Sequence, residues 1–355
     1  MTGYRIVKQR INLVMSLNYL VTGGAGFIGS NYVHRLLERG EKVTIYDNLS
    51  RGGAPRNLEW LQQTFDEKSF SVVVGDVRDA SLIAESAKGS DVIVHLAGQV
   101  AVTTSVIDPR DDFESNALGT FNVLEAARLS GRNPIFIYAS TNKVYGGMDD
   151  VALTEEPTRW RYADLKYGCP ETQPLDFHSP YGCSKGTGDQ YVRDYARIYG
   201  LQSVVYRQSC IYGPRQFGIE DQGWLAWFII AAVMGRAITI YGDGKQVRDA
   251  LHVSDLLDAY DVAVARIDDV KGKVYNLGGG PQNVISVWAE FFPMLEKLLG
   301  KKIKVARGDW RPGDQRVFYA DIRKAEKELG WEPKVSVDEG VTKLFEWVKE
   351  NKEMF

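Results

Sequence analysis

The sequence has 355 residues, of which 44% are hydrophobic and 25% are charged, and its formal net charge is −3. These values are typical of a folded globular protein of about two domains, at ~150 residues per domain, and they argue against intrinsic disorder. The slightly acidic balance also argues against a protein that binds nucleic acid through concentrated positive charge.

The first two hundred residues alternate between short β-branched runs and stretches with helical periodicity. Most of the apolar runs are continuous, which is typical of parallel strands that are covered by helices on both faces. We predict strands at 18–21, 43–47, 70–74, 91–96, 135–139 and 203–206, and helices at 28–39, 82–88, 113–129 and 185–199. This alternation predicts a doubly wound, Rossmann-type α/β fold with right-handed crossovers.

After about Arg207 this alternation gives way to shorter elements separated by glycine- and proline-rich breaks. We predict helices at 223–234, 254–265, 286–299, 322–329 and 337–349. The apolar run at 224–234 is much shorter than the ~20 residues that span a bilayer, so we expect a buried helix and no membrane contact. The expected organisation is an N-terminal extension (1–16), a Rossmann domain (17–206 and 245–270) and a smaller, interleaved α/β substrate domain (207–244 and 271–355).

The chain has three cysteines, Cys169, Cys183 and Cys210, and four histidines that are scattered along it. The odd number of cysteines and their spacing do not fit a disulfide framework or a zinc site. We therefore expect no metal site and a reducing, cytoplasmic location. The basic N-terminal segment lacks the sustained apolar core and cleavage site of a secretory signal.

The segment Thr22-Gly23-Gly24-Ala25-Gly26-Phe27-Ile28-Gly29 follows the first predicted strand and opens the first predicted helix. Glycines at 23, 26 and 29 permit a tight turn, close approach of the backbone to a pyrophosphate, and close packing of the helix on the strand. The second predicted strand ends at Asp47, whose carboxylate would accept hydrogen bonds from a ribose and repel a 2′-phosphate. The pattern predicts NAD as the cofactor, although Arg51 keeps NADP open. The alternative is a purely structural loop in which Asp47 caps the next turn.

Tyr181 and Lys185 are spaced i and i+4, which places both side chains on one helix face. A tyrosine with its ordinary pKa of ~10 is a poor base at neutral pH, but a neighbouring lysine and a positive nicotinamide ring favour the phenolate. Ser140 and Thr141 follow the strand at 135–139, at the sheet edge where ligands bind in such folds. Together with the glycine loop, these residues indicate hydride chemistry on an alcohol.

With these motifs the chain resembles the extended short-chain dehydrogenase/reductase family, in the branch that acts on nucleotide sugars, over about residues 17–350. Within that branch it is most similar to epimerases of CDP-sugars. The segments that carry the narrower similarity are 95–101, 140–146, 175–185, 212–217, 221–224, 244–249 and 314–318. The resemblance implies a small-molecule CDP-sugar substrate, no nucleic-acid or membrane partner, and a homodimer or homotetramer that pairs the helices at 113–129 and 185–199.

The resemblance also implies a role for each matching residue. Tyr181 matches the base, Lys185 its partner on the nicotinamide ribose, and Thr141 the hydroxyl that assists at the sugar. The cofactor positions are Gly23, Gly26, Phe27, Ile28, Gly29, Asp47, Asn48, Ser50, Arg51, Asp76, Val77, Leu96, Ala97, Gly98, Gln99, Tyr181 and Lys185. The substrate positions are Thr141, Asn142, Arg248, Arg311 and Asp314, of which the arginines match a pair that clamps the substrate diphosphate.

One position departs from many relatives, because Cys210 stands where they have an asparagine that contacts the substrate. A smaller, weaker donor alters the sugar pocket, and ordinary buried filler is the alternative. The expected reaction is inversion of C2 of a CDP-linked 3,6-dideoxyhexose through a transient 2-keto sugar. The alternatives are a UDP-sugar 4-epimerase and a non-catalytic NAD(H) sensor. A 4,6-dehydratase is disfavoured, since Asn142 and Lys143 supply no carboxylate pair.

Overall fold

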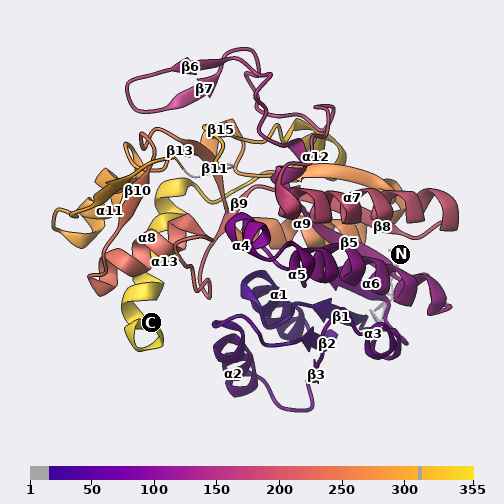
Figure 1. Cartoon of the computed structure of the whole chain (residues 1–355). Helices are drawn as coiled ribbons and strands as arrows, with labels where there is room; N and C mark the ends of the chain where they lie inside the picture. Colours follow the sequence, from indigo (N-terminus) through magenta and orange to yellow (C-terminus); the bar gives the residue numbers. More distant parts are fainter. Residues whose placement is uncertain (1–15, 311–313) are drawn as a thin grey trace, which may run out of the picture.

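The computed structural model describes residues 16–310 and 314–355. Within them, seven parallel strands form the main sheet, in the order β12-β8-β5-β4-β1-β2-β3 (Figure 1). The strands are β1 (Asn18–Thr22), β2 (Lys42–Asp47), β3 (Phe70–Val74), β4 (Val92–His95), β5 (Ile135–Thr141), β8 (Ser203–Gln208) and β12 (Lys273–Leu277). This order, in which the strand sequence reverses between β1 and β4, confirms the predicted Rossmann-type fold.

Helices cover both faces of the main sheet because successive buried residues of each strand point to opposite sides. Leu20 of β1 packs with α3 (Ala80–Ser86), α6 (Gly119–Leu129) and α7 (Ser179–Tyr199). Its neighbour Val21 packs with the other face, which is covered by α1 (Phe27–Glu38), α2 (Ala54–Thr64), α9 (Val253–Ala265) and α12 (Arg323–Leu329). The shorter helices α4 (Val102–Ile107), α5 (Pro109–Phe113) and α10 (Ile267–Val270) complete this part.

A second core lies between α8 (Trp224–Met234), α11 (Phe291–Leu299) and α13 (Val337–Glu350). The strands beside it are β9 (Cys210–Tyr212), β11 (Val247–His252), β13 (Val284–Ser286) and β15 (Val317–Phe318), with the pair β10 (Thr239–Tyr241) and β14 (Ala306–Gly308). The remaining elements are the hairpin β6 (Leu153–Glu155) and β7 (Trp160–Tyr162), at the top of Figure 1, and the 3₁₀ turns η2 (Asn142–Tyr145), η3 (Pro281–Asn283) and η4 (Lys352–Met354). Within the described residues, no helix is both long and apolar enough to cross a membrane.

Several expected elements need correction. The range 271–355, which the sequence assigns to the substrate domain, contains β12, the edge strand of the main sheet. The helix expected over 113–129 is divided by a π-helical turn, η1 (Glu114–Leu118), between α5 and α6. The helix expected at 286 begins at Phe291, because residues 284–286 pair with β11 instead. Conversely, α7 begins at Ser179, well before 185, and α2 has no counterpart among the predicted helices. Residues 1–15 of the expected N-terminal extension (1–16) lie outside the described residues.

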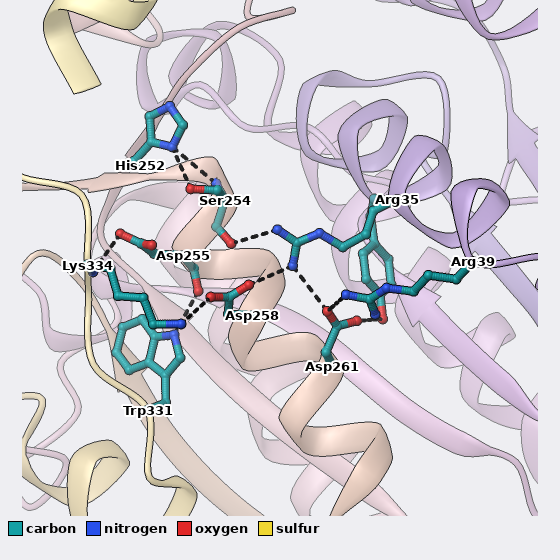
Figure 2. A network of polar contacts seen from close by, with 10 residues as sticks. Arg35, Arg39, His252, Ser254, Asp255, Asp258, Asp261, Trp331 and Lys334 are labelled. Atoms are coloured by element: carbon teal, nitrogen blue, oxygen red, sulfur yellow. Dashed lines mark hydrogen bonds and ion pairs between the residues drawn. The ribbon is translucent and has the colours of Figure 1, made fainter. Parts of the chain in front are cut away.

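A polar network holds the two parts together on the side of α9 (Figure 2). Arg35 of α1 donates to Asp258 at 2.8 Å and to Asp261 at 3.1 Å, both on α9. Lys334, which precedes α13, pairs with Asp258 at 3.0 Å. Asp255 accepts the backbone N–H of Lys334 at 3.0 Å. These contacts join α1, α9 and the approach to α13, so the parts are fixed relative to each other away from the ligand edge of the sheet.

Candidate active site

A cavity of about 780 Å³ opens along the carboxyl ends of β1 to β5. Its walls come from the loops that follow these strands, from α7 on one side, and from the loop at 215–222 on the other. Ligands of doubly wound sheets bind in the crevice at this edge, where the strand order reverses. Every residue predicted to contact the cofactor lines this one cavity, from Gly23 in the first loop to Lys185 on α7.

The glycine loop between β1 and α1 is tightly packed. A Cβ added to Gly29 would lie 2.1 Å from the carbonyl oxygen of Gly23, and one added to Gly23 would lie 2.8 Å from the backbone nitrogen of Ala97. Gly23 also has a φ of +70°, which favours glycine. Gly26 caps α1 without a side-chain hydrogen bond, so the first amides of the helix face the cavity as an anion-binding cradle.

Asp47 and Asp76, at the ends of the second and third strands, both line the large cavity. Asp47 is buried and accepts from the backbone N–H groups of Ala25 at 3.0 Å and Leu49 at 2.8 Å. Burial raises the pKa of its carboxyl, while these N–H groups oppose the rise. Asp47 therefore caps both loops, and a carboxylate still has acceptor capacity for a ribose. The hydrogen bond from Arg78 lowers the pKa of Asp76 to about 2.

Tyr181 and Lys185 lie on the first turns of α7, with 8% and 7% of their surfaces exposed. The Lys185 ammonium sits 4.4 Å from the centre of the Tyr138 ring. Burial lowers its pKa to about 8, and the carboxylates of Asp189 and Asp112 oppose that change. Burial raises the pKa of Tyr181 to about 12, opposed first by a hydrogen bond with Thr141 and then by Arg51. The pair is thus poised so that an added positive charge favours the phenolate.

The hydroxyls at the end of β5 have separate tasks. Ser140 donates to Asp189 at 2.8 Å and is thereby committed to the interior. Thr141 is the hydroxyl that contacts Tyr181, and it also accepts the backbone N–H of Lys143 at 3.2 Å. Asn142 follows Thr141 at the start of η2, and neither lines the large cavity.

Two of the residues predicted to bind the substrate, Arg248 and Asp314, do not line the large cavity. Arg248 on β11 and Asp314 line a separate pocket of about 80 Å³, together with the aromatic rings of Trp224 and Tyr241. Burial lowers the pKa of Arg248, and Asp314 opposes this. The structure therefore brings Arg248 and Asp314 together, as expected. Arg311 lies outside the described residues.

Sequence reasoning missed part of the cavity wall. Arg215, Gln216, Phe217 and Gln222 line the large cavity from the second domain, and the Arg51 side chain donates to the amide oxygen of Gln222 across it. Arg236 and Phe355 also line it. The segments 212–217 and 221–224 are among those that resemble CDP-sugar epimerases, but nothing in their residue spacing indicated contact with the cofactor. No sequence motif pointed to Arg236 or Phe355.

The thiol of Cys210 is not activated as a nucleophile. Burial and then the Asp249 carboxylate raise the pKa of Cys210, on β9, to about 12, and Arg248 opposes the rise. Cys183 is exposed on α7, and its thiol lies 3.5 Å from the carbonyl oxygen of Phe177. Among the described residues, no group of three or more His, Cys, Asp or Glu side chains is placed to hold a metal ion.

Comparison with known proteins gives the same picture at the level of the whole chain. The GDP-mannose 4,6 dehydratase family matches residues 20–344. The CDP-paratose 2-epimerase of Salmonella typhi is 44% identical over 338 residues, which cover 93% of this chain and 99% of that protein. The structure of UDP-glucose 4-epimerase from Thermotoga maritima with UDP-glucose has a TM-score of 0.80 and 31% identity, covering 95% of this chain and 100% of that one. The NAD-bound dTDP-glucose 4,6-dehydratase DesIV of Streptomyces venezuelae has a TM-score of 0.81 and 30% identity, covering 96% and 99%.

Proposed function

From the premise that the chain belongs to the GDP-mannose 4,6 dehydratase family, we propose that it is a CDP-paratose 2-epimerase. It would invert C2 of the sugar and so interconvert CDP-paratose and CDP-tyvelose. The observation that carries the proposal is the 44% identity to the Salmonella typhi enzyme over 99% of its length. The gathering of the cofactor positions around one cavity, with Tyr181 and Lys185 on its wall, supports an oxidoreductive route.

NAD is the cofactor that these residues fit. The uncapped amides of α1 suit a pyrophosphate, and the loop can close tightly over the start of the helix only because Gly29 has no Cβ, which would clash with the Gly23 backbone. Asp47 and Asn48 would hold the adenosine ribose, and Lys185 the nicotinamide ribose. NAD, when bound, supplies the hydride acceptor and donor for the sugar carbon, and we expect it to copurify because the reaction has no net redox change.

The residues of this chain move one proton in each direction. Tyr181 takes the proton of the C2 hydroxyl as that carbon is oxidised. It returns the proton to the same oxygen after the 2-keto sugar has rotated in the pocket to present its opposite face. The Lys185 ammonium stabilises the phenolate form of Tyr181. Thr141, whose hydrogen bond with Tyr181 lowers the pKa of that tyrosine, would hold the sugar oxygen on the line of proton transfer.

The diphosphate of the substrate would be held by Arg248, with Arg311 as its expected partner. Guanidinium groups donate in a fixed fork that matches phosphate oxygens, so an anionic substrate needs only local positive charge in a chain of net charge −3. Asp314, beside Arg248, would face the nucleotide ribose.

The test is direct. The purified protein is incubated with CDP-paratose and the mixture is followed by NMR, and we expect CDP-tyvelose to form without added cofactor. Absence of CDP-tyvelose, in a preparation whose NAD content is verified by mass spectrometry, overturns the assignment.

A UDP-sugar 4-epimerase is the second candidate, because the solved Thermotoga maritima 4-epimerase shares the whole fold with this chain. Conversion of UDP-glucose to UDP-galactose under the same conditions favours it. A 4,6-dehydratase lacks support in the residues, since Asn142 and Lys143 stand after Thr141 and the Lys143 ammonium donates to Gln315 at 3.1 Å. A non-catalytic NAD(H) sensor would turn over neither sugar.

We also propose that the protein is a cytoplasmic homodimer or homotetramer. Exposed apolar side chains gather on the α5–α6 run and on α7, which lie side by side (Figure 1). They are Phe113, Phe121, Leu129, Tyr191, Ile198 and Tyr199. Light scattering on the wild type and on Phe121→Asp tests this, because a charge on the shared face should dissociate the oligomer. The three free cysteines favour a reducing compartment.

A further inference from the structure

A carboxylate without a cationic partner is buried beside the Tyr181–Lys185 pair. Asp112, on α5, has none of its surface exposed. It accepts from the Ser184 hydroxyl at 2.6 Å, the Gln99 amide at 2.9 Å and the Asn116 amide at 3.1 Å. In residues 16–310 and 314–355 no lysine or arginine is within ion-pair distance of it. An ionised carboxylate held only by neutral donors is costly to bury.

The other buried carboxylate near Lys185 is arranged differently. Asp189, one turn farther along α7, is also fully buried, but Arg207 donates to both of its oxygens at 2.9 Å. Ser140 donates to it as well. The charge of Asp189 is therefore matched locally by a guanidinium, whereas the charge of Asp112 has the Lys185 ammonium as a neighbour without a direct bond.

The three donors connect Asp112 to the parts of the site that must stay in register. Gln99 belongs to the cavity wall, and its amide also donates to the carbonyl of Ala101 at 2.8 Å. Ser184 lies between Tyr181 and Lys185 in the sequence of α7. Asn116 lies in the π-helical turn η1 and donates to Ser184 as well, at 3.1 Å. One carboxylate thus joins the cofactor loop to the turn that carries the base.

We propose that Asp112 is a positioning residue for the Tyr181–Lys185 pair: it fixes the catalytic turn of α7 against the Gln99 loop and gives the pair a buried negative neighbour. This rests on the proposed function, in which Tyr181 is the base. A neutral side chain of the same shape would retain most of the bridge, so the charge is the part of Asp112 that acts on the pair.

The sign of the electrostatic effect is the same on both members of the pair. The carboxylate of Asp112 raises the pKa of Lys185 and the pKa of Tyr181. The other charged groups that face the pair are Asp189 from α7 and Arg51 from the loop after β2. His95, on β4, is neutral because burial lowers its pKa to about 3.

Removing the charge therefore lowers both pKa values together. A rate that needs Tyr181 deprotonated and Lys185 protonated follows a bell-shaped dependence on pH. Each limb reports one member of the pair, so both limbs should move to lower pH. A purely structural role would lower the rate or the NAD content and leave the limbs in place.

The test uses Asp112→Asn as NAD-loaded protein. We expect both limbs of the kcat profile to move down by about one pH unit, with kcat at the optimum roughly ten-fold lower. An ultraviolet difference titration of tyrosinate, against Tyr181→Phe in each background, should show the same shift without any sugar. That titration remains valid if the protein proves not to act on CDP-paratose, so failure of the proposal and failure of the proposed function are distinguishable.

Two further variants separate charge from hydrogen bonding. Ser184→Ala removes a donor and keeps the charge, so its rate should fall without a shift of the limbs. Glu114→Gln removes one charge from the adjacent turn, where the side chain is 33% exposed and pairs with Arg110, and it should keep the wild-type profile. If Asp112→Asn does not fold, Asp112→Ser replaces it in the same assays. An unshifted profile and an unshifted tyrosinate titration in the Asp112 variant overturn the proposal.

Discussion

The two halves of the candidate site are built in different ways. The dinucleotide half is a cavity of about 780 Å³, and most of the residues predicted to bind the cofactor there directly follow β1, β2, β3 and β4. The substrate half is a pocket of about 80 Å³ around Arg248 and Asp314, which are distant in sequence and meet because β11 pairs with β15. Typical ligand sites measure ~300–1,000 Å³, so the first cavity has the size of a ligand site and the second is smaller.

The dinucleotide half is preorganised for its ligand. In the dinucleotide half, glycine contacts and backbone caps leave little room for rearrangement, as the 2.1 Å approach at Gly29 shows. Phe217 packs on Gly53, and Arg51 donates to Gln222, so these contacts join the loop at 215–222 to the opposite wall of the large cavity. We therefore expect changes in one half to leave the ligand of the other half bound, and the variants below examine that independence.

The largest effect is expected for Tyr181→Phe, which removes the base and keeps the ring. General acid–base catalysis contributes about 10²–10⁴-fold, so kcat should fall by that order while the NAD content stays at the wild-type level. Tyr199→Phe is the matched control, since it removes a hydroxyl from an exposed position on the same helix. Steady-state kinetics and mass spectrometry of released NAD check both. Full turnover in Tyr181→Phe would exclude Tyr181 as the base.

The next effect concerns Arg248→Gln, in the substrate half. Loss of one partner from a buried charged contact costs about 2–5 kcal/mol, so kcat/KM for the CDP-sugar should fall by roughly 30-fold or more. The loss should appear mainly in KM, because the diphosphate is bound equally in the ground state and the transition state. Arg307→Gln, an exposed arginine of the same domain, should behave as wild type. Loss of NAD from Arg248→Gln would show that the halves are not independent.

The sequence predicted the dinucleotide half well for a physical reason. Parallel strands place their carboxyl ends at one edge, so a motif such as the Gly23–Gly29 loop needs only its own strand to be located. The six predicted strands of the main sheet are present, and the residues predicted to bind the cofactor share one cavity.

The parts that were missed depend on long-range pairing or on packing. Strand β12 joins the sheet beside β8 only after the chain has passed through the second domain, and no local pattern reports that return. Ser286 is the first residue of the helix predicted at 286–299, but it pairs with β11 as part of β13, because tertiary contacts override local preference. Phe217 reaches the cavity by packing on Gly53, a contact between segments far apart in the chain that no motif encodes.

A smaller effect, on stability, is expected at the contact between Gly53 and Phe217. A Cβ on Gly53 would lie 2.3 Å from the Phe217 ring, so Gly53→Ala should cost about 1–3 kcal/mol of stability by overpacking. Thermal unfolding and NAD retention measure the result. In a Phe217→Ala background the same change should be nearly neutral, as a double-mutant cycle would show. Gly52→Ala is the stability control, because its Cβ would meet nothing within 4 Å. An equal cost of Gly53→Ala in both backgrounds contradicts the contact.

The smallest effect, on stability, is expected for the exposed Arg78–Asp76 ion pair of the dinucleotide half. It contrasts with the effect at Arg248, which is buried in the substrate half. Arg78 donates to Asp76 at 2.9 and 2.7 Å, but the two side chains are 39% and 27% exposed, so solvent screening limits their contribution to less than about 1 kcal/mol. The pKa of Asp76 is lowered to about 2, below the ~3.9 of a free aspartate. The stabilisation is therefore present above pH ~3.9 and is lost as the pH falls towards 2.

Urea unfolding measures this effect. The free energy of unfolding of Arg78→Gln should be slightly lower than that of the wild type at pH 7, and the difference should shrink at pH 3 and in high salt. Arg110→Gln, whose side chain is 85% exposed, should show no such trend. If the loss of unfolding free energy in Arg78→Gln is independent of pH, Arg78 stabilises the dinucleotide half by packing and not through its charge. The dinucleotide half would then depend on an arginine side chain for packing, as the Arg248 pocket does.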